Sequence, residues 1–178
     1  FFSCQSRTLW NTIMIRNTVV REATRQDVPA VVPIWAELME IYAQLDPFFT
    51  CCEGAAERFA EYIAGNIDKD NWHVLVAEAD GQVVGYLQGS IETCPPILAT
   101  QRYGNVHDMA VAAAYRRRGL GREMVQQALA WFGSQGVTRF EVSMSIHNRT
   151  AKAFWQSLGF EPYLQSSFVQ RDALRPSS

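Results

Sequence analysis

The sequence predicts one α/β domain, in which a mixed central sheet of about six to seven strands is flanked by about four helices. Three observations lead to this fold class. The chain has 178 residues, a length that suits one domain. Hydrophobic residues make up 48% of it and charged residues 19%, which is enough apolar material for a packed core. The spacing of hydrophobic residues changes along the chain between that of a strand and that of a helix, in the order β-α-α-β-β-β-α-β-α-β.

The first part of the chain predicts a strand and then two helices. Residues 17–23 form a short segment that contains β-branched residues, as expected for a strand. Thr24 and Asp27 have the spacing of a capping box, and apolar residues follow at helical spacing. Pro33 lies inside that pattern, so we expect this helix to kink or restart there. The second helix is predicted over 55–67.

The middle of the chain predicts a hairpin and a further strand. In residues 73–78 and 82–92, apolar residues either alternate with polar ones or follow one another. Asp80-Gly81 between these segments is a typical two-residue turn. Cys94 and two prolines end the second of these strands. The next strand is predicted over 105–111.

The last part of the chain predicts two more helices, each followed by a strand. An amphipathic helix is expected over 119–135, since glycines stand at both of its ends. Alternation predicts a strand over 138–145, and helical spacing returns over 148–160. The tail, 166–174, is predicted to add a last strand.

Composition narrows the function classes. The formal net charge is −2, which argues against a nucleic-acid-binding protein. The four cysteines form neither a disulfide framework nor a zinc pattern, so we predict reduced thiols, no metal site and a cytoplasmic location. The sequence has no run of 18 apolar residues, so it predicts no transmembrane helix. Residues 1–13 lack a periodic pattern and are interpreted as an appendage to a domain over 14–178.

The stretch "RRRGLG", residues 116–121, lies between a predicted strand and an amphipathic helix. It could be a basic patch for nucleic acid, a phosphate cradle or an ordinary charged loop. The first N–H groups of a helix lack internal partners and carry partial positive charge, so a glycine-rich helix entry is suited to an anion. The spacing is neither GxGxxG nor that of a P-loop.

Several motifs together resemble the GCN5-related N-acetyltransferase (GNAT) superfamily over roughly residues 17–172. The Arg116-x-x-Gly119-x-Gly121 spacing matches the [QR]-x-x-G-x-[GA] pattern of that family. The segment "NRTAKAFWQSLGF" is similar to its N-x-x-A-x-x-[FL]-Y-x-x-x-G-F helix. The opening "VREATRQDVPAV" and the strand "VVGYLQG" are also typical, and the four fragments stand in the family's order.

The resemblance implies acetyl-coenzyme A as cofactor. It also implies that the fourth and fifth strands splay apart and that the pantetheine arm of the cofactor enters the gap between them. The residues it assigns to the cofactor are Met109, Ala110, Val111, Arg116, Arg117, Arg118, Gly119, Leu120, Gly121, Arg122, Asn148, Ala151 and Phe154. The loop amides would wrap the pyrophosphate, and the strand backbone would pair with the arm. For the arginines after Arg116 a solvated role is an alternative, and for Phe154 a place in the core.

The implied reaction is transfer of an acetyl group to a primary amine of a small molecule or peptide, by direct attack in a ternary complex. The base is expected to be His107 or Asp108, and His107 is preferred because a histidine pKa of about 6.5 suits a general base near neutrality. Only one of the two should face the cleft, unless a bulge intervenes. Glu92 is a further candidate.

Trp155 departs from the family pattern, which has a tyrosine there that is thought to protonate the leaving thiolate. An indole N–H is not a practical proton donor. A non-catalytic acyl-CoA-binding or sensor protein therefore stays open as the alternative function. Aromatic residues near Phe48 and Phe49 are candidates for a lid or for contacts in a homodimer, and the sequence does not identify the acetyl acceptor.

Overall fold

The computed structural model describes residues 17–170 of the chain. The chain divides into two compact units, the first ending at Ser143 and the second beginning at Met144. The appendage predicted over 1–13 lies outside the described residues.

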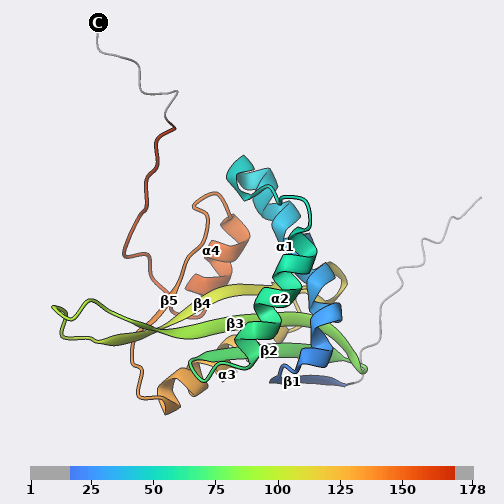
Figure 1. The fold of residues 1–178 in the computed structure, drawn as a ribbon. Helices are drawn as coiled ribbons and strands as arrows, with labels where there is room; N and C mark the ends of the chain where they lie inside the picture. The colour runs from blue at the N-terminus through green and yellow to red at the C-terminus, as the bar shows by residue number, and fades with distance from the viewer. Residues whose placement is uncertain (1–16, 171–178) are drawn as a thin grey trace, which may run out of the picture. The chain divides into compact units, whose positions relative to one another are not determined.

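The first unit is built on one mixed sheet with the strand order β1-β2-β3-β4-β5. The strands are β1 (Thr18–Glu22), β2 (Trp72–Ala79), β3 (Gln82–Thr93), β4 (Arg102–Val111) and β5 (Phe140–Val142). Neighbours from β1 to β4 pair antiparallel, whereas β5 pairs parallel to β4. The prediction of a mixed α/β fold is therefore confirmed, and Figure 1 shows the strands lying side by side.

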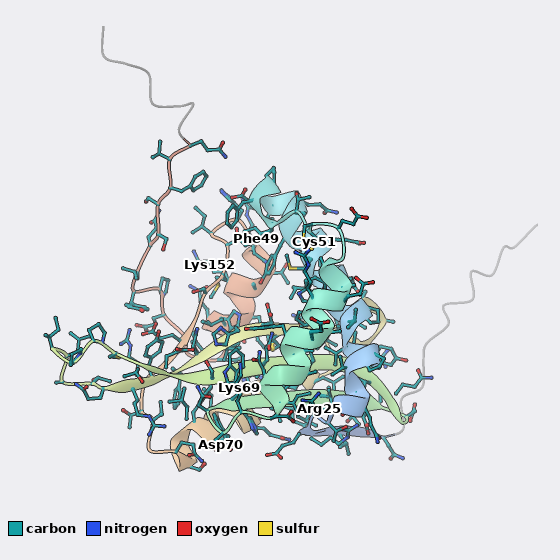
Figure 2. All side chains as sticks on the ribbon, in the orientation of Figure 1. Arg25, Phe49, Cys51, Lys69, Asp70 and Lys152 are labelled. Carbon is teal, nitrogen blue, oxygen red and sulfur yellow. The ribbon has the colours of Figure 1, made fainter. Side chains whose placement is uncertain are left out.

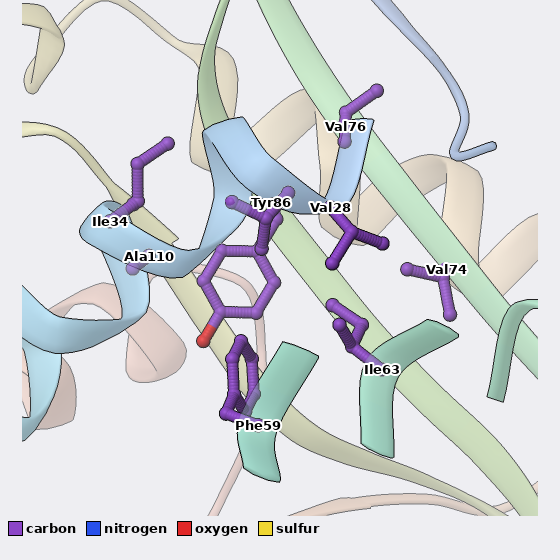
Figure 3. Packing of buried hydrophobic residues seen from close by; sticks show 9 residues of the cluster. Val28, Ile34, Phe59, Ile63, Val74, Val76, Tyr86 and Ala110 are labelled. Atoms are coloured by element: carbon purple, nitrogen blue, oxygen red, sulfur yellow. The ribbon is translucent and has the colours of Figure 1, made fainter. Parts of the chain in front are cut away.

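Helices cover both faces of this sheet. The apolar residues of α1 (Val28–Leu45) and α2 (Ala55–Ile67) pack against β2 and β3, and Figure 3 shows the core that they form. On the other face, α3 (Leu120–Ser134) places Phe132 against Gly89 and Gly104, where any side chain would collide with its ring. The central strand β3 is buried along most of its length because both of its faces are covered.

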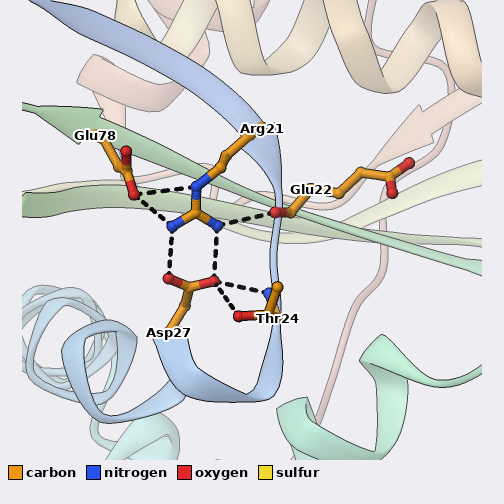
Figure 4. Close-up of polar contacts among 5 residues, drawn as sticks. All are labelled: Arg21, Glu22, Thr24, Asp27 and Glu78. Carbon is orange, nitrogen blue, oxygen red and sulfur yellow. Dashed lines mark hydrogen bonds and ion pairs between the residues drawn. The ribbon is translucent and has the colours of Figure 1, made fainter. Parts of the chain in front are cut away.

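Two local predictions are confirmed at the start of the chain and in the hairpin. The Thr24 N–H and hydroxyl donate to the Asp27 carboxylate at 2.7 and 2.9 Å, and Asp27 also binds Arg21 (Figure 4). Asp80 and Gly81 join β2 to β3 with φ angles of +49° and +80°, as a two-residue hairpin turn requires.

Two predictions about elements were wrong. Residues 17–170 contain five strands rather than six or seven, and 166–170 of the predicted last strand have no regular structure. This stretch includes Phe168 and Val169, which are exposed; β-propensity produces a strand only where packing and a neighbouring strand support it. Residues 171–174 of the same prediction lie outside the described part of the chain.

The first helix does not restart at Pro33, because α1 runs without interruption from Val28 to Leu45. The N–H that Pro33 lacks would have bonded the carbonyl of Pro29, in the first turn of the helix. The missing hydrogen bond therefore lies near the start of an 18-residue helix, and the hydrogen bonds of the later turns keep the helix continuous.

The second unit contains α4 (Arg149–Gln156). The Asn148 side chain caps this helix by accepting a hydrogen bond from the Ala151 N–H at 2.9 Å. The Trp155 ring lies between those of Phe154 and Phe160, with centroid distances of 5.2 and 5.0 Å. No helix within residues 17–170 has the length and apolar character needed to cross a membrane.

Candidate active site

The pairing between β4 and β5 is short and ends inside β4. It covers Gly104–Val106 against Phe140–Val142, whereas β4 continues to Val111. The Ala112 N–H donates to Val84 on β3, and backbone groups alternate in direction along a strand. Met109 and Val111 therefore direct their N–H and C=O groups away from β3, toward the side where the parallel pairing has already ended.

A β-bulge occurs in β4 at the two candidate bases. Gly89 pairs with Val106 and Gln88 pairs with Asp108, so His107 is an extra residue in its strand. His107 contacts Ser90 and Asp108 contacts Gln88, and these two β3 residues share one face of the sheet because they are two positions apart. The bulge thus places both candidate bases on the face covered by α1 and α2.

Asp108 ends a chain of buried hydrogen bonds. Its Oδ2 accepts from Gln88 Nε2 at 2.8 Å, and Gln88 Oε1 accepts from Asn66 Nδ2 at 3.2 Å. The chain begins at Lys69, which lies just after α2 (Figure 2). The Lys69 Nζ donates to Asn66 Oδ1 at 2.9 Å. Burial raises the pKa of Asp108, while the Gln88 hydrogen bond acts in the opposite direction.

Both ring nitrogens of His107 have protein partners. Nε2 lies 2.7 Å from Ser90 Oγ, and Ser90 Oγ also donates to Glu92 Oε1. Nδ1 lies 3.5 Å from the side-chain amide of Asn105, and the ring stacks on Trp72 with a centroid distance of 4.7 Å. Burial lowers the pKa of His107, although Glu92 and Asp108 partly counteract it. Burial therefore favours the neutral form of the imidazole.

The 116–121 loop leads directly into the N-terminus of α3. Gly119 precedes the helix with φ +89°, and the first bond within the helix joins Glu123 N–H to the Gly119 carbonyl. The N–H groups of Leu120 and Gly121 thus come before any acceptor in the helix. The Leu120 side chain is buried in the core, so only its backbone is available to a ligand.

The arginines of this loop are partly engaged within the protein. Arg116 Nε donates to the Val111 carbonyl at 2.7 Å, and its guanidinium also binds Glu37 on α1. Arg118 donates to the Ala114 carbonyl at 3.3 Å. Arg117 adopts a left-handed φ of +64°, and its side chain is exposed.

The sequence singled out the two candidate bases and the loop, but not the polar residues around these candidates. Asn66, Gln88 and Ser90 are fully buried polar residues, and Tyr86 is buried beside them. A signal was present, because Gln88 and Ser90 interrupt an apolar strand at alternate positions. Asn148, Ala151 and Phe154 belong to the second unit. Within residues 17–170, no three His, Cys, Asp or Glu side chains are grouped closely enough to hold a metal ion.

Comparison with protein families gives a match to the Acetyltransferase (GNAT) family over residues 35–160. The chain belongs to this family. The resemblance drawn from the loop and helix motifs is thereby confirmed.

Among similar proteins, an uncharacterised N-acetyltransferase of Methanocaldococcus jannaschii is 21% identical over 161 residues, which are 90% of this chain and 68% of the length of that relative. The mouse N-acetyltransferase family 8 member 3 is 30% identical over 102 residues, 57% of this chain. This chain spans only 44% of the length of that mouse relative.

Solved structures share the GNAT fold at low identity. A tetramutant of the BH1408 protein from Bacillus halodurans has a TM-score of 0.74 and is 20% identical to this chain. The match covers 85% of this chain and 99% of the BH1408 chain. The aminoglycoside N-acetyltransferase AAC(6')-Iy in complex with CoA has a TM-score of 0.67 and 18% identity, covering 87% of this chain and 95% of its own.

Proposed function

We propose that this GNAT protein is an N-acetyltransferase that moves an acetyl group from acetyl-CoA to a primary amine by direct attack in a ternary complex. The observation that carries the proposal is the β4 bulge, which puts two candidate bases on one face just before Met109 and Val111, whose backbone groups point away from β3. A thioester held along that edge would lie next to a group able to accept the proton of the amine.

The residues of the first unit fit acetyl-CoA. The N–H groups of Leu120 and Gly121 stand at the positive end of α3, where a pyrophosphate is favoured. The edge of β4 offers the backbone of Met109 and Val111 to the arm, as in strand addition. The Val111 carbonyl already accepts from Arg116, so the pairing would use the Val111 N–H and the groups of Met109. When bound, acetyl-CoA supplies the thioester carbonyl and a thiolate leaving group.

We propose Asp108 as the base, rather than His107. Within residues 17–170, one Asp108 oxygen accepts from Gln88 and the other has no hydrogen-bond partner, whereas both His107 nitrogens are engaged. A raised pKa also makes the buried Asp108 carboxylate a better proton acceptor than a solvated one. His107 then acts as a neutral neighbour of the base.

The reaction balances with Asp108, the Val111 N–H and solvent. The ammonium gives one proton to Asp108, and the lone pair of the resulting amine attacks the thioester carbonyl to form the C–N bond. The Val111 N–H, which points away from β3, is placed to stabilise the oxyanion. The C–S bond then breaks, and the nitrogen loses its second proton to solvent. The thiolate, whose parent thiol has a pKa of about 8.5, takes a proton from solvent.

A non-catalytic acyl-CoA-binding protein is the second candidate, and Trp155 is the observation that favours it. The Trp155 indole packs between two phenylalanine rings and offers no acidic proton to a thiolate. The roles of Asn148, Ala151 and Phe154 stay predictions, as do a cytoplasmic location and a homodimer.

One experiment separates these two functions. The protein is incubated with acetyl-CoA and a panel of primary amines and peptides, and free thiol is measured over time, with CoA affinity determined by calorimetry. Thiol release that depends on an amine supports the transferase. CoA binding without release on any amine supports the sensor, and no CoA binding contradicts both.

A further inference from the structure

A buried hydroxyl without a partner lies beside the candidate base. Tyr86 has no exposed surface, and within residues 17–170 its hydroxyl is the buried side-chain polar atom for which no hydrogen bond is found. Leaving such a group unpaired costs about 1–3 kcal/mol, and buried polar groups are nearly always paired in folded proteins. The Tyr86 hydroxyl therefore has a hydrogen-bonding capacity that the described residues do not use.

The position of this hydroxyl relates it to Asp108. Tyr86 pairs with Ala110 and Gln88 pairs with Asp108, so Tyr86 and Asp108 are diagonal neighbours on the same face of the sheet. The charge of Asp108 contributes to raising the pKa of Tyr86, although burial is the larger cause. The Tyr86 phenol and the Asp108 carboxylate thus lie on the same face of the sheet, the one covered by α1 and α2.

The surroundings of this cluster are apolar. The Tyr86 ring packs edge-on against Phe59, which stacks on Trp35 at 4.3 Å. In Figure 3 the Tyr86 hydroxyl points toward the Phe59 side of the core, away from Val28 and Val74. A few convergent polar groups in an apolar lining are characteristic of a small-molecule site.

We propose that Asp108 and Tyr86 form the subsite that binds the acetyl acceptor as a primary alkylammonium cation. This inference rests on the proposed transferase function and names the substrate class of the same site. An ammonium has three N–H donors and no acceptor, which matches the unpaired Asp108 oxygen and the lone pairs of the Tyr86 hydroxyl. The aromatic rings of Phe59 and Trp35 provide an apolar surface that suits the alkyl carbons next to the nitrogen.

The amide chain behind Asp108 keeps this subsite selective for a cation. Because Lys69 can only donate, it orients Asn66, and Asn66 in turn orients Gln88 with its NH₂ toward Asp108. Gln88 occupies one carboxylate oxygen and leaves the other for the substrate. The same oxygen first pairs with the ammonium and then accepts its proton, so recognition and deprotonation use one atom.

The decisive variant is Tyr86→Phe, which removes the unpaired hydroxyl and keeps the ring. We expect KM for the amine to rise about tenfold, as for loss of one hydrogen bond to a charged group, with CoA affinity unchanged. The free protein should be as stable as the wild type or more stable, because a buried unpaired group is lost. Tyr103→Phe, at the other end of β4, is the control and should leave KM unchanged.

Calorimetry separates this proposal from the proposed function. Butylamine and its neutral analogue butanol are titrated into the CoA-bound wild type, Tyr86→Phe and Asp108→Asn proteins. Butylamine binding that weakens in both variants supports the subsite, even if the wild type shows no turnover. Turnover with an unchanged KM in Tyr86→Phe overturns the subsite and leaves the transferase standing, since the hydroxyl then takes no part in amine binding. Equal binding of butanol and butylamine, or binding of neither, also overturns the cationic subsite.

Discussion

Gln88 Nε2 donates to Asp108 Oδ2 at 2.8 Å, and this bond ties a fully buried amide to the candidate base. The bond stabilises the charged form of Asp108, whereas burial destabilises it. The basicity of Asp108 is therefore set by a balance that one substitution can change.

We predict that Gln88→Leu moves the acid limb of the kcat/KM profile to higher pH. The limb reports the pKa of the base, and a lost hydrogen bond to a charged group is worth about 1.5–3 kcal/mol, or roughly one to two pH units. The same change leaves the Asn66 amide unpaired, so the free energy of unfolding should fall by about 1–3 kcal/mol. Rate profiles and urea unfolding measure the two effects.

Gln127→Leu is the matched control for this substitution. Gln127 lies on α3 and donates to the Val20 carbonyl at 3.3 Å, away from the face that carries Asp108. Its loss should leave the acid limb in place. An acid limb that stays unmoved in Gln88→Leu would show that Asp108 is not the titrating base.

The two candidate bases are predicted to respond differently to removal. Asp108→Asn should lower kcat at least a hundredfold, the usual range for a general base, while calorimetry shows unchanged CoA affinity. His107→Ala should lower kcat less and keep the acid limb, because both imidazole nitrogens are already bonded to the protein. The reverse pattern, with the limb lost in His107→Ala, would assign the base to His107.

The sequence predicted the elements that have a strong local signal. The Asp80-Gly81 turn needs two left-handed residues, and α3 shows apolar spacing with glycines at both ends, so both could be found without tertiary information. The predicted strand over 166–174 failed in its described part because propensity says nothing about whether a neighbouring strand is available.

The candidate site was predictable only in outline. His107 and Asp108 could be selected by residue type, but the bulge that turns both to one face depends on pairing with β3. Nothing local links Asn66 on α2 with Gln88 on β3, or shows that the Tyr86 hydroxyl stays unpaired. These features arise from packing between elements far apart in the sequence.

Gly119→Glu is predicted to abolish CoA binding, which calorimetry measures. The substitution places a carboxylate where an anion is expected and forces a side chain onto φ +89°, although the space for a Cβ atom is open. Gly136→Glu, after the other end of α3, is the matched control because Gly136 has φ +74° and equally open space. Both variants should lose about 1–2 kcal/mol of stability, but only the first should lose affinity. Equal affinity in the two variants would refute the phosphate cradle.

The ion pair between Asp27 and Arg21 predicts a stability that depends on pH (Figure 4). Hydrogen bonds from Arg21, foremost, and from Thr24 lower the pKa of Asp27 from 3.8 to about 2. A carboxyl with a lowered folded-state pKa stabilises the fold above its unfolded pKa and loses that contribution as pH falls toward the folded value. Asp27→Asn should therefore lower the free energy of unfolding by about 2 kcal/mol at pH 7, and the difference from wild type should shrink between pH 4 and pH 2.

Asp68→Asn is the control for this last prediction. Asp68 also binds an arginine, Arg25, and its pKa is lowered by that hydrogen bond, but both side chains are more than half exposed. Solvent screens such a pair, so its removal should change stability little at any pH. Urea unfolding of both variants from pH 2 to pH 7 makes the comparison. A pH-independent loss in Asp27→Asn would mean that Asp27 acts through the shape of the helix start rather than through its charge.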